Sequence, residues 1–309
     1  MLSRVADNLY WFGRYLQRAE NTARLINVND SVRMDLPKHL RLGWDSLVDI
    51  VGAQAAFDKL YTEPSEANVL QFLVLDERNP GSVLSSLRQA REILRASRDT
   101  LPGETWEKIN DLHRQVQAGG EKSLQRRHRQ GVLSTVTDGC ITIFGLLIAN
   151  MSRDLGFQFL GIGTHLEQAD MTTRIIDARS TPVLRVRQAG EVTPFETVQW
   201  MSVLRSLTGT QMYRRHVRHR VSGPQVLRFL LQNREFPRSV MFCLTSIERT
   251  LPALPQSRPM QRALERAKSL VRDADLDALL DDGLKKFLDE VQVGLAAFHE
   301  ALTVSCFRG

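Results

Sequence analysis

Apolar residues recur every three or four positions along most of the chain, which is the period of an amphipathic helix. Near the N-terminus the repeating positions are Leu2, Val5, Leu9, Phe12, Leu16, Ala19, Ala23 and Ile26. Similar spacing predicts further helices over 40–61, 81–100, 104–118, 122–152, 156–178, 195–220, 224–233, 237–251, 260–273 and 276–307. Proline and glycine lie between these ranges, where they interrupt helices. Alternation typical of a strand occurs only at Val183–Arg187, which we expect to belong to a loop. The pattern predicts an all-α protein.

Two pairs of segments in the chain resemble each other. Residues 13–27 align with residues 163–177 at an offset of 150, and the two segments share Gly, Leu, Ala, Thr, Arg and Ile. Residues 72–87 align with residues 229–244 at an offset of 157, with Phe, Leu, Pro, Ser and Val in common. The two matches follow the same order along the chain, which indicates a degenerate tandem duplication.

The duplication predicts one helical domain built from two repeats about a pseudo-twofold axis. The repeats would cover roughly 1–149 and 150–309. A longer loop at Arg179–Pro194 would account for the difference between the two offsets. Gly13 and Gly163 occupy equivalent positions, where the missing side chain lets another helix approach closely.

Composition favours a globular cytoplasmic protein. The 309 residues are 42% hydrophobic and 25% charged, which excludes a disordered chain. The three cysteines lie far apart, which argues against a zinc ribbon or a disulfide framework and favours a reducing compartment. The charge-free segment 139–152 is shorter than the ~20 residues of a membrane span, so we expect a buried helix and no membrane association. Arginines interrupt the N-terminal segment, so no secretory signal is predicted.

The first candidate site is Glu20 with its counterpart Asp170, the two proposed catalytic residues. Each carboxylate lies on or beside the apolar face of its helix and has an arginine four residues later, Arg24 or Arg174. One interpretation is a buried ion pair that fixes how two helices dock, since a buried carboxylate needs a partner. The other is a pair of acid–base groups facing a cleft. Repetition of the arrangement in both halves favours the structural interpretation.

The second candidate site is a proline-marked junction between a loop and a helix. Its residues are Asn79, Pro80 and Ser82 in the first half and Pro237 and Ser239 in the second. The free N–H groups of a helix start, with Arg78 or Arg238 nearby, could hold a phosphate or carboxylate. Alternatively, Ser82 and Ser239 are helix N-caps, which are far commoner than ligand sites. The sequence favours caps.

Basic residues exceed acidic ones, with 41 Lys and Arg against 35 Asp and Glu. The runs Tyr213–Arg220 and 126–129 lack the interleaved aromatic residues of a nucleic-acid site, so solvated helix ends are favoured over nucleic acid. His216 and His219 have metal-binding spacing, but the adjacent arginines would repel a cation. The chain carries no Walker loop, nucleophile elbow, zincin helix or dinucleotide fingerprint. No metal or cofactor is expected.

The N-terminal segment Met1–Arg24 resembles the opening of the bacterial alpha-E domain proteins. Residues 76–82 and 236–240 resemble that family too, and the resemblance covers essentially the whole chain. One departure is Gln17, where the family pattern usually reads Glu, although Glu20 is intact. The resemblance implies an all-helical bacterial protein.

The resemblance also implies partners. Family members occur beside, or fused to, circularly permuted ATP-grasp proteins, often with transglutaminase-like proteases. That setting implies a peptide-ligation or peptide-tagging system in which the ATP-grasp protein forms the amide bond. The chain would then be a non-catalytic helical partner that docks on that protein or presents its acceptor peptide. Alternatively, it is an enzyme using Glu20 and Asp170 as acid and base. The arginines that would bind a partner, carboxylate or phosphate are Arg14, Arg18, Arg24, Arg78, Arg174 and Arg238.

Overall fold

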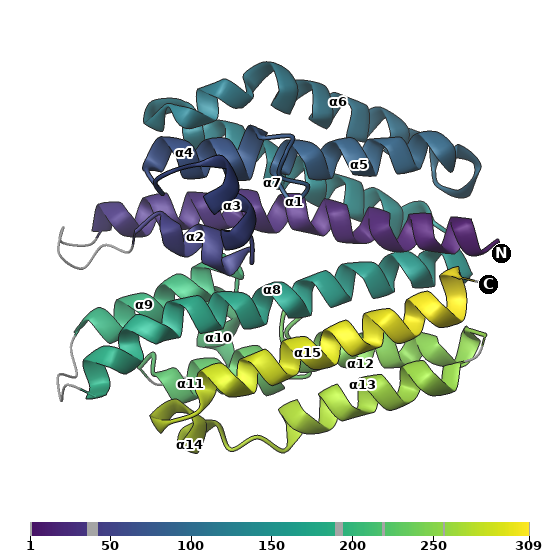
Figure 1. The fold of residues 1–309 in the computed structure, drawn as a ribbon. Coiled ribbons are helices and arrows are strands. Elements are labelled where there is room, and N and C mark those ends of the chain that lie inside the picture. The colour runs from purple at the N-terminus through teal and green to yellow at the C-terminus, as the bar shows by residue number, and fades with distance from the viewer. Residues whose placement is uncertain (1, 36–42, 189–193, 218–219, 256, 309) are drawn as a thin grey trace. The chain divides into compact units, whose positions relative to one another are not determined.

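The computed structural model describes residues 2–35, 43–188, 194–217, 220–255 and 257–308. The structure is 83% helical, and no strand occurs among the described residues. The predicted all-α fold class is therefore confirmed. The chain divides into two compact units, Met1–Thr164 and His165–Gly309. The purple-to-teal helices of Figure 1 form the first unit, and the teal-to-yellow helices form the second.

The first unit is built on four longer helices. They are α1 (Ser3–Asp35), α5 (Val83–Ala96), α6 (Gly103–Gly119) and α7 (Arg126–Asn150). Helices α5 and α7 both pack on α1, and α6 packs on α5 and α7, so the four helices enclose one core. Shorter elements join them: α2 (Asp45–Ile50), α3 (Gln54–Leu60), α4 (Glu66–Leu70), the π-helical turn η2 (Gln71–Leu75), and the 3₁₀ turns η3 (Arg98–Thr100) and η4 (Gly120–Leu124).

The second unit continues from the long helix α8 (Leu155–Gln188), whose first turns, through Thr164, belong to the first unit. Helix α13 packs on both α12 and α15, and α8 contacts α12 through the rings of His165 and Phe242. The remaining bounds are α9 (Pro194–Ser206), α10 (Thr210–His216), α11 (Gly223–Leu227), η5 (Arg228–Gln232), α12 (Val240–Thr250), η6 (Leu251–Ala253), α13 (Ser257–Arg272), α14 (Leu276–Asp281), α15 (Leu284–Leu302) and η7 (Thr303–Phe307).

Three predicted helices are wrong in extent because the chain breaks inside them. The range 40–61 contains a break between α2 and α3 at Gly52, which has a positive φ of 67°. The range 195–220 is divided between α9 and α10 near Thr208, which has a φ of 53°. The range 276–307 is divided between α14 and α15 at Gly283, which has a φ of 92°. A left-handed residue ends the helical hydrogen bonding, whatever the apolar spacing around it.

Two predictions around α8 and α4 also need correction. The loop expected at Arg179–Pro194, with strand-like alternation at Val183–Arg187, is wrong because α8 continues to Gln188. A short alternating run is a weak signal beside an established helix. The segment 189–193 lies outside the described residues. The ten residues of α4 and η2 form a helical segment that the periodicity did not single out.

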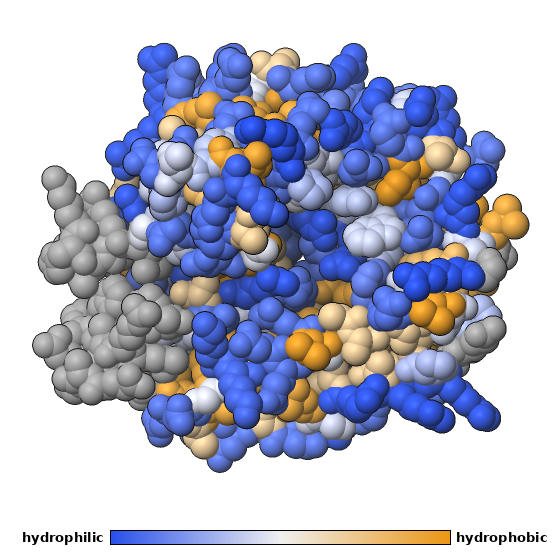
Figure 2. All heavy atoms as spheres, in the orientation of Figure 1, coloured by the Kyte–Doolittle hydropathy of each residue, from blue (hydrophilic) through white to orange (hydrophobic). Residues whose placement is uncertain are grey.

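Helix α7 contains the charge-free segment 139–152 up to its end at Asn150. It is the one helix of the described residues long and apolar enough to cross a membrane by length and composition, and 33% of its most apolar window is buried. Its buried row, which includes Leu133, Val136, Cys140, Ile143 and Leu147, faces the bundle that α7 forms with α1 and α6. The expected buried helix is therefore buried on one face only, and Ile141 and Ile148 are exposed. The view in Figure 2 shows a mostly hydrophilic surface with scattered hydrophobic patches.

Candidate functional site

Residues 13–27 lie in the middle of α1, and the residues 163–177 that align with them lie near the beginning of α8. Within the first unit, the two glycines lie where α1 and the first turns of α8 meet. A Cβ atom on Gly13 would lie 2.5 Å from the carbonyl oxygen of Leu160, and one on Gly163 would lie 2.1 Å from that of Tyr10. Real Cβ atoms do not approach a backbone that closely, so this crossing requires glycine at both positions.

Glu20 lies in a buried cluster on α1. Its side chain is 1% exposed, and Nε of Arg24 donates a 2.7 Å hydrogen bond to Oε1. The amide of Gln17 donates to the other carboxylate oxygen, Oε2, at 2.8 Å and to Oδ1 of Asn21 at 2.9 Å. Burial raises the pKa of the Cys140 thiol on α7 well above its usual range, and the nearby charge of Glu20 adds to that rise. Both carboxylate oxygens are therefore engaged by neighbours on the same helix.

Asp170 forms the corresponding pair on α8 but in a wetter environment. Its carboxylate accepts a 2.8 Å hydrogen bond from Nε of Arg174, and the two side chains are 23% and 31% exposed. One turn earlier, at the position equivalent to Gln17, Glu167 is buried. The hydroxyl of Thr172 donates to the carbonyl oxygen of Arg238 at 2.8 Å and so links α8 to the start of α12. The deeper acid of this helix is Glu167, not Asp170.

The burial patterns of α1 and α8 agree closely. Positions 5–29 and 155–179, paired at the offset of 150, have the same degree of burial at 24 of 25 positions. The single exception is the pair Glu20 and Asp170. The exception lies at the candidate site, so the acid is buried in α1 and partly exposed in α8.

Arg14 and Arg18 lie against aromatic rings of α1. The Arg14 guanidinium donates a 3.1 Å hydrogen bond to the Tyr10 hydroxyl and lies 5.3 Å from the Trp11 ring centroid. Arg18 lies 5.6 Å from the centroid of the Tyr15 ring. Contacts of this kind restrict the orientation of a guanidinium group.

The junction before α5 is a folded loop whose side chains satisfy its own backbone. Arg78 donates two hydrogen bonds to the Asp76 carboxylate, at 2.9 and 2.7 Å, and the Tyr61 hydroxyl adds a third at 2.7 Å. These bonds hold the pKa of Asp76 below its usual 3.8, at about 2, with the Arg78 hydrogen bond as the main cause. Asn79 accepts from the Gly81 N–H group at 2.9 Å, and Ser82 caps α5 by accepting from Ser85 N–H at 3.1 Å.

The junction before α12 has the same construction with different chemistry. Asn233 Oδ1 accepts hydrogen bonds from the backbone N–H groups of Glu235 and Phe236 at 2.8 and 2.7 Å. Ser239 caps α12 by accepting from the N–H group of Phe242 at 3.1 Å. A π-helical turn precedes each loop, η2 in the first unit and η5 in the second. Asn233 holds the place of Asp76, so this loop lacks the buried carboxylate.

The two basic runs differ from each other. In the first, Arg129 of α7 is buried, with hydrogen bonds to Asp30 at 3.0 Å and to the Ser123 carbonyl oxygen at 3.1 Å. In the second, the last turn of α10 contains His216, whose pKa is raised, chiefly by its hydrogen bond to the Met212 carbonyl oxygen. Residues 218–219, and with them His219, lie outside the described residues. Among the residues that are described, no three His, Cys, Asp or Glu side chains gather as a metal ion would need.

The sequence did not predict that three polar residues near these clusters are buried, and the expectation that the run 126–129 is solvated is wrong for Arg129. Gln17 bridges Glu20 and Asn21, Glu167 replaces that amide in α8, and Arg129 is enclosed beside Trp44. The offset of 150 relates Gln17 to Glu167, so the alignment of the two halves contained the signal for that pair.

The comparisons with known proteins agree with this helical architecture. Residues 1–307 match the family Alpha-E, described as a predicted alpha-helical domain with a conserved ER motif. The chain belongs to the Alpha-E family. An uncharacterized protein of Mycobacterium bovis and one of Mycobacterium tuberculosis are each 26% identical to this Alpha-E chain over 323 aligned positions. The matches cover 95% of this chain but 35% of each relative, so the chain spans about a third of their length. No solved structure matches the chain significantly.

Proposed function

We propose that this Alpha-E protein is a non-catalytic helical component of an ATP-dependent peptide-ligation or peptide-tagging system. In this role it docks on a circularly permuted ATP-grasp protein or presents that protein's acceptor peptide. The observation that supports a non-catalytic role is the state of Glu20, which is 1% exposed and bound through both oxygens. A general acid or base must reach a proton on its substrate, and this carboxylate has no open face for one.

The partner assignment rests on the family resemblance and on the length of the relatives. In the mycobacterial relatives the matching region is 35% of the chain, so it is joined to a larger protein body. That arrangement supports an Alpha-E unit that works together with other domains. A transglutaminase-like protease of the same system is a second candidate partner, and the cytoplasm is the compartment we propose.

We also propose that the chain arose by duplication of a helix–loop–helix set. The matched burial of α1 and α8 and the matched loops before α5 and α12 support this origin. A further correspondence supports it, since a Cβ atom on Gly139 of α7 would lie 2.7 Å from the side chain of Leu112, and one on Gly294 of α15 would lie 3.1 Å from that of Ala267. These glycines lie 155 positions apart, between the offsets expected from a drifting repeat.

The test is reconstitution with the ATP-grasp partner. The tagged protein is used to isolate that partner from the host, and ATP turnover by the partner is measured with and without the Alpha-E chain. We expect ATP turnover by the partner to depend on the Alpha-E chain. The Glu20→Gln variant should support the same turnover below its melting temperature. The absence of both complex and stimulation would contradict the proposal.

The alternative is an enzyme, and Asp170 is the observation that favours it. Its carboxylate is 23% exposed beside Arg174, so solvent and a substrate can reach it. In that case Asp170→Asn abolishes turnover while the protein keeps its stability and its complex. Full turnover by the Asp170→Asn variant would exclude this alternative.

A further inference from the structure

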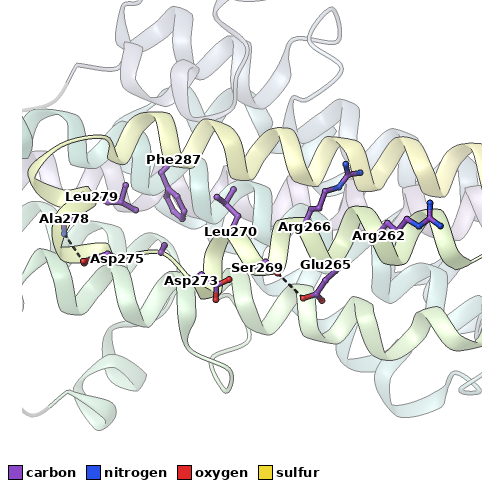
Figure 3. Close-up of a pocket in the computed structure, with 11 residues that line it drawn as sticks. Arg262, Glu265, Arg266, Ser269, Leu270, Asp273, Asp275, Ala278, Leu279 and Phe287 are labelled. Atoms are coloured by element: carbon purple, nitrogen blue, oxygen red, sulfur yellow. Dashed lines mark hydrogen bonds between the residues drawn. The ribbon is translucent and has the colours of Figure 1, made fainter.

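The second unit contains an open groove of about 1140 Å³ that none of the preceding sites uses. Helices α13, α14 and α15 form its walls (Figure 3). Leu270 of α13, Leu279 of α14 and Phe287 of α15 lie together at one end, and Arg266 and Arg262 follow along α13. The groove therefore has an apolar end and a basic end.

The acidic side chains of this groove already have partners. Glu265 and Asp273 both accept hydrogen bonds from Arg272, at 3.2 and 3.0 Å. Asp275 accepts from the first free N–H groups of α14 and is the N-cap of that helix. Figure 3 shows Glu265 and Asp273 on the side of α13 that faces away from the row of Arg266 and Leu270. The charge of these acids is therefore used within the chain.

The two arginines of the groove, unlike its acids, have no partner among the described residues. Arg262 and Arg266 are exposed, and neither forms a hydrogen bond or ion pair with any described residue. Two guanidinium groups thus line one end of the groove, and neither is paired with an acid among the described residues. A ligand that brings carboxylates to this end and apolar side chains to the other is electrostatically complementary.

The spacing along α13 specifies the shape of that ligand. Arg262, Arg266 and Leu270 are four residues apart, so they form one row with a step of about 6 Å. A helix laid along the row presents side chains with the same step, as in other helix-in-groove complexes. The groove is open to solvent and larger than typical small-molecule pockets, which enclose most of their ligand.

We propose that this groove binds an acidic amphipathic helix of a partner protein. Two carboxylates of that helix, one turn apart, pair with Arg262 and Arg266. Its following apolar residues cover Leu270, Leu279 and Phe287. This inference goes beyond the proposed function, because the groove shares no residue with the Glu20 or Asp170 clusters and its test needs neither ATP nor the ATP-grasp protein.

The test uses the full chain and a fluorescent alanine-rich peptide of roughly 16 residues, long enough to form a helix. One face of the peptide carries Glu at two successive i, i+4 positions and Leu on the next two turns. A second peptide has Lys in place of both Glu, and a third moves the Glu residues to the opposite face. Fluorescence anisotropy is expected to show binding of the first peptide and binding at least about tenfold weaker for the other two.

Variants connect the binding to the groove. Arg262→Glu/Arg266→Glu is expected to lose at least about tenfold in affinity for the Glu peptide and to gain affinity for the Lys peptide. Arg126→Glu/Arg127→Glu changes two exposed arginines of α7 by the same charge and is expected to leave binding unchanged. Leu279→Ser is expected to weaken binding without any change in charge. Melting curves check that each variant is folded.

Several outcomes would overturn the proposal. Equal binding of the Glu and Lys peptides would show that charge does not direct recognition. Unchanged binding by Arg262→Glu/Arg266→Glu would place the peptide elsewhere on the chain. The remaining outcomes apply if the Glu peptide does not bind. Association of the chain with anionic phosphatidylglycerol vesicles, lost in the double variant, would identify a membrane surface as the occupant. Self-association lost in the double variant would identify a second copy of the chain.

Discussion

Helices α1 and α8 share one pattern of burial over 25 paired positions and differ at a single pair, Glu20 and Asp170. In α1 the acid is buried beside an amide, Gln17, which donates a hydrogen bond to it. In α8 the position of that amide is taken by Glu167, which is itself buried. Two buried carboxylates one turn apart would repel each other, whereas Asp170 is partly exposed. Over the 25 paired positions, each helix therefore has one buried acid, Glu20 in α1 and Glu167 in α8.

The difference shows that the position of an acid along its helix does not by itself determine whether that acid is buried. The helical frame decides which positions face the interior, and it does so in the same way for both helices. The neighbour one turn earlier then decides whether an acid at position 20 or 170 is buried. The comparison predicts that a substitution at the glycine crossing of α1 and α8 strongly lowers stability, whereas substitutions of the two acids differ in their effect on stability.

The largest expected effect comes from the helix crossing that sets the frame. Gly163→Ala places a Cβ 2.1 Å from the Tyr10 carbonyl oxygen, so the helices must separate. We expect a loss of about 3 kcal/mol in the free energy of unfolding, measured by urea denaturation. Gly161→Ala is the matched control on the same helix, because nothing lies within 4 Å of its Cβ position. It should be neutral or stabilising by about 1 kcal/mol. Equal effects of the two substitutions would show that the crossing does not need glycine.

The second effect contrasts the two acids directly. Glu20→Gln removes the charge that pairs with Arg24 in a buried cluster, and we expect a loss of about 2 kcal/mol in the free energy of unfolding. Asp170→Asn alters a partly exposed pair, and we expect a loss below about 0.5 kcal/mol. Urea denaturation of both variants at neutral pH measures the contrast. Unchanged stability of Glu20→Gln, together with lost activity of the reconstituted system, would refute the packing role of Glu20.

The third effect concerns the serine caps of α5 and α12, one in each unit. Ser82→Ala and Ser239→Ala each remove an N-cap hydrogen bond of about 3.1 Å, to Ser85 N–H and Phe242 N–H respectively. Loss of such a cap costs about 1 kcal/mol, so thermal melting should show a lower melting temperature for both variants. The shift should be larger for Ser239→Ala, because the Ser239 hydroxyl also donates to the Asn233 carbonyl oxygen. Replacement by Asn or Asp, which also cap helices, should restore most of the stability. A loss confined to one variant would show that the two loops are not equivalent.

The apolar period was enough to predict the fold class and the main bundle helices, but not their breaks. Thr208 and the two glycines at 52 and 283 adopt positive φ, and the periodicity runs through them. The loop expected after Arg179 failed for the opposite reason, because local signals of irregularity did not stop α8. Helix breaks depend on the backbone conformation of single residues, and tertiary packing determines that conformation.

The sequence contained part of the candidate site. The i, i+4 spacing predicted the pairs of Glu20 with Arg24 and of Asp170 with Arg174, both of which the structure contains. The unequal burial of the two acids was not predictable from their own positions, since it depends on neighbours such as Gln17. The groove could not be predicted from the sequence, for a different reason. Arg262 and Arg266 look like any solvated helix face until α14 and α15 place apolar side chains beside them.

The smallest expected effect concerns Asp76, one of several positions at which the two loops differ in charge. Asp76 has a pKa of about 2, below its usual 3.8, because Arg78 and Tyr61 stabilise its charged form. A depressed pKa in the folded state adds stability above about pH 4, and that stability is lost as the pH falls toward 2. Asp76→Asn should therefore be less stable than the parent at neutral pH, by less than about 1 kcal/mol because Arg78 is largely exposed.

The pH dependence is the sharper measurement for this variant. The difference between the parent and Asp76→Asn in urea denaturation should shrink as the pH falls from about 4 to about 2, because Asp76 becomes increasingly protonated over this range. Asn233→Asp is the reciprocal control, because its loop holds no ion pair equivalent to Arg78 and Asp76 among the residues described. That variant should gain no stability at neutral pH. A constant difference across the pH range would mean that Asp76 acts through its shape and hydrogen bonds, and not through its charge.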